Sequence, residues 1–147
     1  MGRIVAIDYG QKRVGLAVTD ELQLIATSLA TVPANEIFEF LRGYVAKEKV
    51  ECFVVGEPKH LDNTASDASR FIEPFIIRLK KEFRNIPVER MDERFTSKIA
   101  GQTILNSGLK KKARQNKALV DTISATIILQ SFLEFKKFIA HRASLID

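Results

Sequence analysis

The sequence is poor in the residues that build disulfides and zinc sites. Its 147 residues include one cysteine, Cys52, and two histidines. A single cysteine cannot form a disulfide within the chain, and the apolar run around Cys52 predicts a small buried side chain. Structural zinc is excluded too, because such sites take four cysteine or histidine ligands. This cysteine content fits a reducing compartment, and we expect a cytoplasmic protein.

Long hydrophobic runs are also missing. No stretch approaches the ~20 apolar residues that a transmembrane helix needs, so we expect no membrane partner. The first strand is expected directly after Met-Gly-Arg, which leaves no secretory signal. Hydrophobic residues make up 46% of the chain and charged residues 28%, as in ordinary globular proteins. With no repeat, low-complexity tract or linker, residues 1–147 are expected to form a single domain.

Acidic residues are absent from one basic segment, LKKKARQNK at 109–117. Its five cations account for the whole net charge of +5. They are Lys110, Lys111, Lys112, Arg114 and Lys117. A local excess of one sign indicates a polyanion partner such as nucleic acid, and the alternative is a solvated connection between helices.

Hydrophobic periodicity predicts alternating strands and helices. Strands are expected at 4–7, 14–18, 24–32, 51–58 and 86–95. Helices are expected at 36–49, from about 66 to 83, at 98–107 and at 118–139. Asn35 is the expected cap of the first helix, and Pro74 lies within the second. Phe38, Leu41 and Val45 share one side of the first helix. The order predicts an α/β fold, in which a three-strand antiparallel meander and αβ units form a mixed five-stranded sheet with helices on both faces.

Acidic side chains follow the predicted strands where such folds place their chemistry. Asp8, Glu57 and the pair Asp92 and Glu93 all lie at expected carboxyl ends. Alternation along the first strand puts Asp8 on the same face as Ile4 and Ala6. A local turn hydrogen bond is the alternative role for Asp8.

Asp121 lies in the first turn of the long C-terminal helix. It shares an apolar stripe with Ala125 and Ile128, and it is the only acid between Glu93 and Glu134. One interpretation is that it complements the positive end of the helix dipole. The other is that it faces the strand ends and joins Asp8.

Several carboxylates at one sheet end require cations to remain ionised together. Oxygen ligands without histidine or cysteine favour Mg²⁺ or Mn²⁺, and two such ions bridged by an aspartate promote phosphodiester hydrolysis. An alternative is the phosphate hairpin of actin-like ATPases, which "DYGQKRVG" also fits. The chain has no room for the second domain of those proteins and no second hairpin.

Four blocks together carry a family resemblance: VAIDYGQKRVGLAVTD, FVVGEPKHLD, VERMDERFTS and KALVDTISATIILQSFL. In order and spacing they resemble the YqgF (RuvX) family. The resemblance implies a ribonuclease H-like fold, related to Holliday-junction resolvases, and a nuclease that matures the 5′ end of pre-16S ribosomal RNA. It assigns Asp8, Glu93 and Asp121 as catalytic metal ligands, and the ligand chemistry above predicts that they bind Mg²⁺ or Mn²⁺ as two ions.

Cations beside these acids are expected to meet nucleic-acid phosphates. Lys12 and Arg13 lie in the first hairpin, and Arg94 directly follows Glu93. Lys110, Lys111, Lys112 and Arg114 are expected to grip the backbone without recognising sequence. An internal ion pair with Asp92 or Glu93 is an equal alternative for Arg94.

Glu57 and His60 each have two possible roles, and two further functions are alternatives to the ribosomal RNA nuclease. Glu57 replaces the apolar residue more usual in the family, and it is either a fourth ligand or a partner of Lys59; His60 is a proton shuttle or simply exposed. A ribosomal precursor particle is the expected RNA partner. A branched-DNA junction nuclease, which needs a dimer for symmetric cuts, and a non-catalytic RNA-binding assembly factor are the alternatives.

Overall fold

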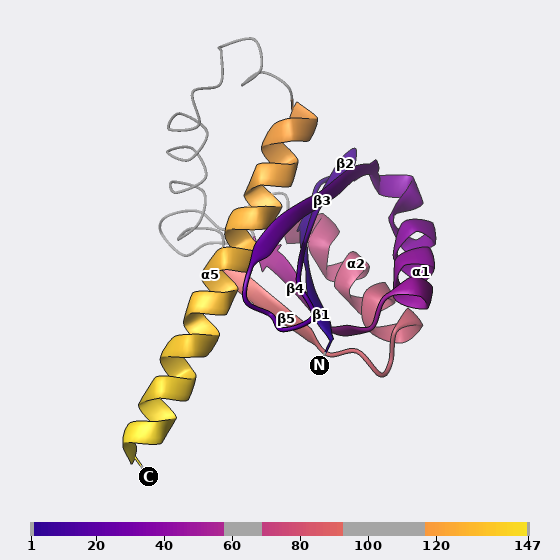
Figure 1. Cartoon of the computed structure of the whole chain (residues 1–147). Coiled ribbons are helices and arrows are strands. Elements are labelled where there is room, and N and C mark those ends of the chain that lie inside the picture. Colours follow the sequence, from indigo (N-terminus) through magenta and orange to yellow (C-terminus); the bar gives the residue numbers. More distant parts are fainter. Residues whose placement is uncertain (1, 58–68, 93–116, 147) are drawn as a thin grey trace.

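The computed structural model describes residues 2–57, 69–92 and 117–146, and the side chains at 2–57, 71–92 and 123–142. Five strands form one mixed sheet in the order β3-β2-β1-β4-β5 (Figure 1). β1 (Arg3–Tyr9), β2 (Arg13–Thr19) and β3 (Ala26–Pro33) form the antiparallel meander. β4 (Val50–Glu57) runs parallel to β1, and β5 (Val88–Asp92) runs parallel to β4. The predicted mixed sheet is confirmed.

Helices connect and cover these strands. A short 3-10 turn, η1 (Ala34–Glu36), leads into α1 (Ile37–Lys47), and α2 (Ser69–Glu82) lies between β4 and β5. The chain's last described element is the long helix α5 (Lys117–Ile146). The helix predicted at 98–107 and most of the basic segment fall outside the described residues.

The two faces of the sheet carry separate hydrophobic cores. On one face Val5 and Ile7 of β1 pack with helix residues that include Leu41 of α1 and Leu79 of α2. On the other face Ile4, Ala6, Ala17, Cys52 and Val54 pack against five residues of α5: Ala125, Ile128, Leu129, Phe132 and Leu133. Successive side chains of a strand point to opposite faces, which explains the division. Helices on both faces are therefore confirmed (Figure 1).

Helix boundaries differ from the predictions at the start of α1 and at the end of α5. Asn35 does not cap α1, because it already lies within η1; the N-cap is Glu36, whose side chain makes no capping hydrogen bond. Pro74 lies inside α2, as predicted, so the turn there lacks one backbone donor. α5 continues past Ile139 to Ile146, where no proline or glycine interrupts it. None of the described helices has the length and apolar character needed to cross a membrane.

Cys52 is buried, as predicted, and we expect its thiol to be unreactive in the folded protein. Burial raises its pKa to about 11, so at pH 8 only about one thiol in a thousand is the nucleophilic thiolate. Reaction with a chromogenic disulfide reagent should be at least ~100-fold slower in buffer than in denaturant. The rate should rise about tenfold per pH unit between 8 and 10; a fast, pH-independent reaction would contradict this burial.

Candidate active site

Asp8 lies near the carboxyl end of β1, the central strand of the sheet, and is half-buried. Its neighbours Ile7 and Tyr9 pack in the core on the α1 and α2 face, so Asp8 lies on the other face with Ile4 and Ala6. This agrees with the prediction, and the covering element on that face is α5.

Glycines flank Asp8 on both neighbouring strands. Its partner on β2 is Gly15. On β4, Ile7 pairs with Val55, so the next residue, Gly56, lies beside Asp8. Because a glycine has no side chain, neither of these two register partners places a side chain beside the Asp8 carboxylate on the α5 face.

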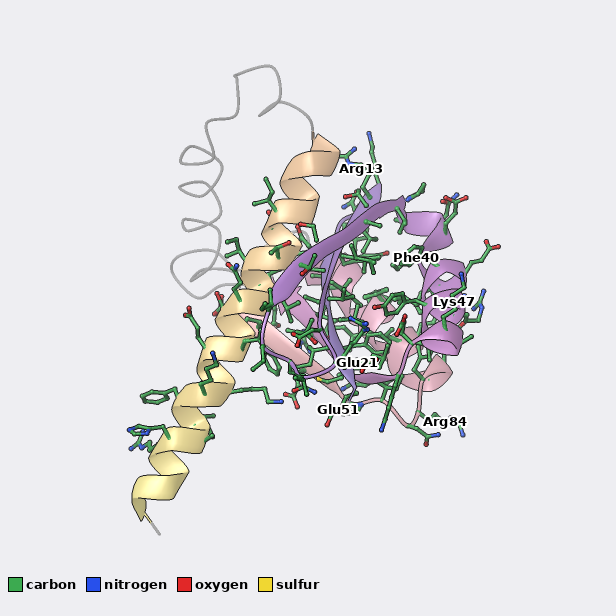
Figure 2. All side chains as sticks on the ribbon, in the orientation of Figure 1. Arg13, Glu21, Phe40, Lys47, Glu51 and Arg84 are labelled. Atoms are coloured by element: carbon green, nitrogen blue, oxygen red, sulfur yellow. The ribbon has the colours of Figure 1, made fainter. Side chains whose placement is uncertain are left out.

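The hairpin after β1 brings two cations to the same end of the sheet. The Gly10 N–H donates to the Arg13 carbonyl oxygen over 2.9 Å, and a Cβ at Gly10 would lie only 2.7 Å from that oxygen. The tight turn therefore requires glycine. Lys12 is exposed and Arg13 half-buried, and Figure 2 shows Arg13 at the end of the sheet where α5 begins.

Glu57 lies on the opposite face of the sheet from Asp8. It follows Phe53 and Val55, whose side chains belong to the core under α1 and α2. Arg90 of β5 donates to Glu57 over 2.8 Å and also to Glu73 of α2. This geometry favours a structural ion pair over a fourth metal ligand, and the observed partner is Arg90.

The ion pair between Arg90 and Glu73 shifts the pKa of both partners toward their charged forms. The hydrogen bond from Arg90 lowers the pKa of Glu73, and the same contact raises the pKa of Arg90. Arg90 of β5 thus connects the carboxyl end of β4 to α2 through Glu57 and Glu73. No sequence pattern signalled this cluster, since its members are 17 and 33 residues apart.

Asp92 ends β5 and pairs in register with Glu57. By alternation it shares the face of Val88 and Arg90, away from α5, whereas Met91 packs into the core beneath α5. Asp92 therefore does not share the face of Asp8.

Most other predicted site residues fall outside the described part of the chain. These are Glu93, Arg94, His60, Lys110, Lys111, Lys112 and Arg114. Asp121 lies within α5, one turn before the fully buried Ala125, but its side chain is not described. Among the described side chains, no three histidine, cysteine, aspartate or glutamate groups gather at one point. Asp8 is thus the one predicted ligand whose side chain is placed.

α5 is fixed to the sheet at the level of its first buried turns. The Ser28 and Thr126 hydroxyls of β3 and α5 lie 2.9 Å apart in a hydrogen bond. Ala125, fully buried, packs in the same core as Ala6. The helix face that carries position 121, four residues before Ala125, is therefore oriented by direct packing on β1.

The overall fold of the chain is similar to that of a solved resolvase. "T. thermophilus RuvC in complex with Holliday junction substrate" superposes with a TM-score of 0.52 at 16% sequence identity, over 87% of this chain and 92% of that chain. The fold is therefore the ribonuclease H-like fold of the resolvases.

Sequence comparison defines the family. The model of the RuvX family, described as Holliday junction resolvase, matches residues 2–135, and the chain belongs to this family. A Bacteroides thetaiotaomicron protein is 62% identical over 94% of this chain and 100% of its own length. A Flavobacterium psychrophilum protein is 55% identical over 92% and 99%, respectively. Both are named "Putative pre-16S rRNA nuclease", which places the chain among nucleases.

Proposed function

We propose that this chain is a divalent-metal-dependent nuclease that cleaves phosphodiester bonds in the 5′-end maturation of pre-16S ribosomal RNA. The observation that carries the proposal is the position of Asp8, at a strand end on the α5 face between Gly15 and Gly56. The names of the relatives from Bacteroides and Flavobacterium supply the substrate. A cytoplasmic location and a single domain over residues 1–147 stay predictions.

Three carboxylates form the proposed metal centre. Asp8 is placed at the end of β1, and Glu93 is proposed as the second ligand from the family motif. Asp121 precedes the buried Ala125 by one helical turn and is proposed as the third ligand. Carboxylate oxygens without histidine or cysteine suit Mg²⁺ or Mn²⁺, and we propose two ions. Bound there, such ions would polarise the scissile phosphate and activate a water.

The chain's own residues orient the substrate. Lys12 and Arg13 stand on the hairpin directly after Asp8, where they would bind phosphates on either side of the cleaved bond. Arg94 is proposed to do the same from the segment after β5. Lys110, Lys111, Lys112 and Arg114 would hold the RNA backbone further from the cleaved bond.

Neutralising the basic segment should weaken binding for every RNA sequence alike. With Lys110, Lys111 and Lys112 changed to Gln, the slope of log affinity against log salt should become shallower by about 2 to 3 units. The matched control changes three exposed lysines of α1 and α2, Lys47, Lys80 and Lys81, to Gln. Filter binding over a salt series measures the slope for each variant. Equal slopes for the two variants would mean that the basic segment is a solvated connection between helices.

The decisive experiment is cleavage of end-labelled substrates by the wild-type chain. The panel contains single-stranded RNA, duplex RNA, a pre-16S 5′-leader transcript and a four-way DNA junction, each with Mg²⁺, Mn²⁺ or EDTA. We expect metal-dependent cutting of RNA, concentrated in the leader. Tight RNA binding without cutting under any metal would identify a non-catalytic assembly factor and reject the proposal.

A second candidate function is cleavage of branched DNA. The description of the RuvX family model as Holliday junction resolvase favours it. Junction resolution requires two symmetric nicks, and hence two active sites related by a dimer axis. Symmetric cutting of the four-way junction, with the RNA substrates intact, would select this function.

A further inference from the structure

Beyond Leu133, α5 extends past the sheet, and three of its described apolar side chains are exposed. Phe132 packs against the sheet, but Phe135, Phe138 and Ile139 are 51%, 60% and 49% exposed. Figure 1 shows this end of α5 projecting past the sheet. Residues 134–142, here called the tail, therefore present an apolar stripe at the i, i+3, i+4 spacing of a helix–helix contact.

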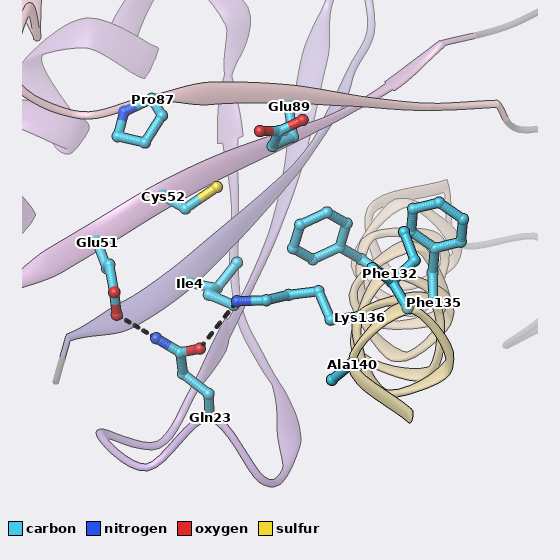
Figure 3. A pocket seen from close by; sticks show the side chains of 11 residues that line it. Ile4, Gln23, Glu51, Cys52, Pro87, Glu89, Phe132, Phe135, Lys136 and Ala140 are labelled. Atoms are coloured by element: carbon cyan, nitrogen blue, oxygen red, sulfur yellow. Dashed lines mark hydrogen bonds between the residues drawn. The ribbon is translucent and has the colours of Figure 1, made fainter. Parts of the chain in front are cut away.

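A groove of about 480 Å³ lies between this stripe and the beginnings of β4 and β5. Its apolar lining includes Ile4, Cys52, Pro87, Phe132, Phe135 and Ile139 (Figure 3). Ile4 is at the start of β1, so the groove and Asp8 lie at opposite ends of the same sheet face, roughly 13 Å apart along the strand. The groove is thus separate from the proposed metal centre.

Carboxylates border the groove on the strand side. Glu51 accepts hydrogen bonds from the Gly2 N–H over 3.3 Å and from Gln23. The Gln23 amide oxygen in turn accepts from Lys136 over 3.3 Å, so Lys136 is engaged within its own chain (Figure 3). Glu89 stands exposed on β5.

The tail carries the opposite charge. Glu134 is its only acid, and Lys137 and Arg142 are exposed cations beside the apolar stripe. One surface of the chain therefore combines an apolar groove with an acidic border and an apolar helix with basic flanks. A surface that holds both halves of a complementary pair can bind itself across a two-fold axis.

We propose that this surface binds a second copy of the chain, with the two tails antiparallel and each tail against the other's groove. We place the two-fold axis of the dimer at the level between Phe138 and Ile139. Arg142 and Phe135 each lie about 5 Å from this level along the helix, in opposite directions. In an antiparallel pair, Arg142 of one copy therefore lies at the same height as Phe135 of the other. Phe135 lines the groove together with Glu89, so Arg142 pairs with Glu89 of the second copy. RNA or an anionic membrane could meet the cations of the tail but would leave Glu89 without a complementary charge, which Arg142 of a second copy supplies.

The buried area sets the expected strength. With about 200 Å² for each large side chain, the exposed parts of Phe135, Phe138 and Ile139 amount to about 300 Å² per copy. Over both copies, and with the groove lining that partly coincides with these side chains, the total stays below the ~1,000 Å² of stable specific interfaces and matches a weak, transient contact. The dimer should therefore be weak, with a Kd on the order of 10–100 µM.

Sedimentation equilibrium from ~1 to ~300 µM tests the proposal on the full chain. The average mass of the wild type should rise from one copy toward two, whereas Phe138→Asp should stay monomeric throughout. The matched control is Ile77→Asp, because Ile77 on α2 is similarly exposed at 54% and lies outside the tail; it should behave as the wild type. Circular dichroism verifies the fold of each variant.

Charge reversal tests the pairing itself. Glu89→Lys and Arg142→Glu should each weaken dimerisation at least fivefold, and the double variant should recover most of the loss. A wild type that stays monomeric at 300 µM overturns the proposal, as does a dimer that Phe138→Asp leaves intact. Monomeric protein whose RNA affinity falls in Phe138→Asp would assign the groove to RNA. None of these measurements depends on nuclease activity.

Discussion

Changing Asp8 to Asn should slow phosphodiester cleavage at least about a thousandfold and leave RNA affinity unchanged or slightly higher. The amide keeps the shape of the side chain but removes the negative charge with which Asp8 would hold divalent cations. Binding depends mainly on phosphate contacts with cations, and a lost negative charge next to phosphate does not weaken them. Single-turnover cleavage at saturating Mg²⁺ and filter binding in EDTA measure the two quantities separately.

Asp20 provides the matched control for this change. Its Oδ1 accepts two 2.8 Å hydrogen bonds from the Leu24 and Ile25 N–H groups, and an asparagine oxygen can accept the same bonds. Asp20→Asn should therefore cleave RNA like the wild type. If Asp8→Asn cleaved within about tenfold of the wild type, Asp8 would not be a metal ligand and the proposed centre would be wrong.

Two adjacent acids should respond very differently to the same loss of charge. We expect Glu93→Gln to reduce cleavage about a hundredfold or more, and Asp92→Asn to change it by less than about threefold. The reason is that strand alternation puts Asp92 on the face of Val88 and Arg90, away from Asp8, whereas Glu93 is proposed as a metal ligand.

Metal titration distinguishes loss of a ligand from local disruption. Glu93→Gln should require a higher Mg²⁺ concentration for half-maximal cleavage, whereas Asp92→Asn should keep the wild-type midpoint. Equal losses in both variants, without a shift of the midpoint, would mean that the end of β5 supports the site only through its structure. Thermal melts of both variants control for unfolding.

Strand and helix order could be predicted because the periodicity signals are local. The alternation of Ile4, Ala6 and Asp8 fixed the face of Asp8 correctly, and the packing of Ile4 and Ala6 against α5 confirms it. Helix ends were predicted less well. Asn35 is a residue type that often caps helices, but here it lies inside the 3-10 turn η1, which directly precedes α1.

Contacts distant in sequence could not be predicted. Glu57 was given two roles, as a ligand or as a partner of a nearby lysine, and neither included Arg90, which is 33 residues away. Deciding its face required the strand register and the two cores, which no single strand reveals. The metal ligands Glu93 and Asp121 stay predictions from the family motif, because their side chains lie outside the described residues.

The placement of α5 has a consequence for how the chain folds during synthesis. Of the ten buried residues in the core beneath α5, five belong to the sheet, and the other five belong to α5, which is made after every strand of the sheet. At 5–20 residues per second, β4 leaves the ribosome several seconds before α5. During that time the sheet residues of this core lack their α5 partners. The face of the sheet that carries Asp8 can therefore acquire its final packing only after the first half of α5 has been made.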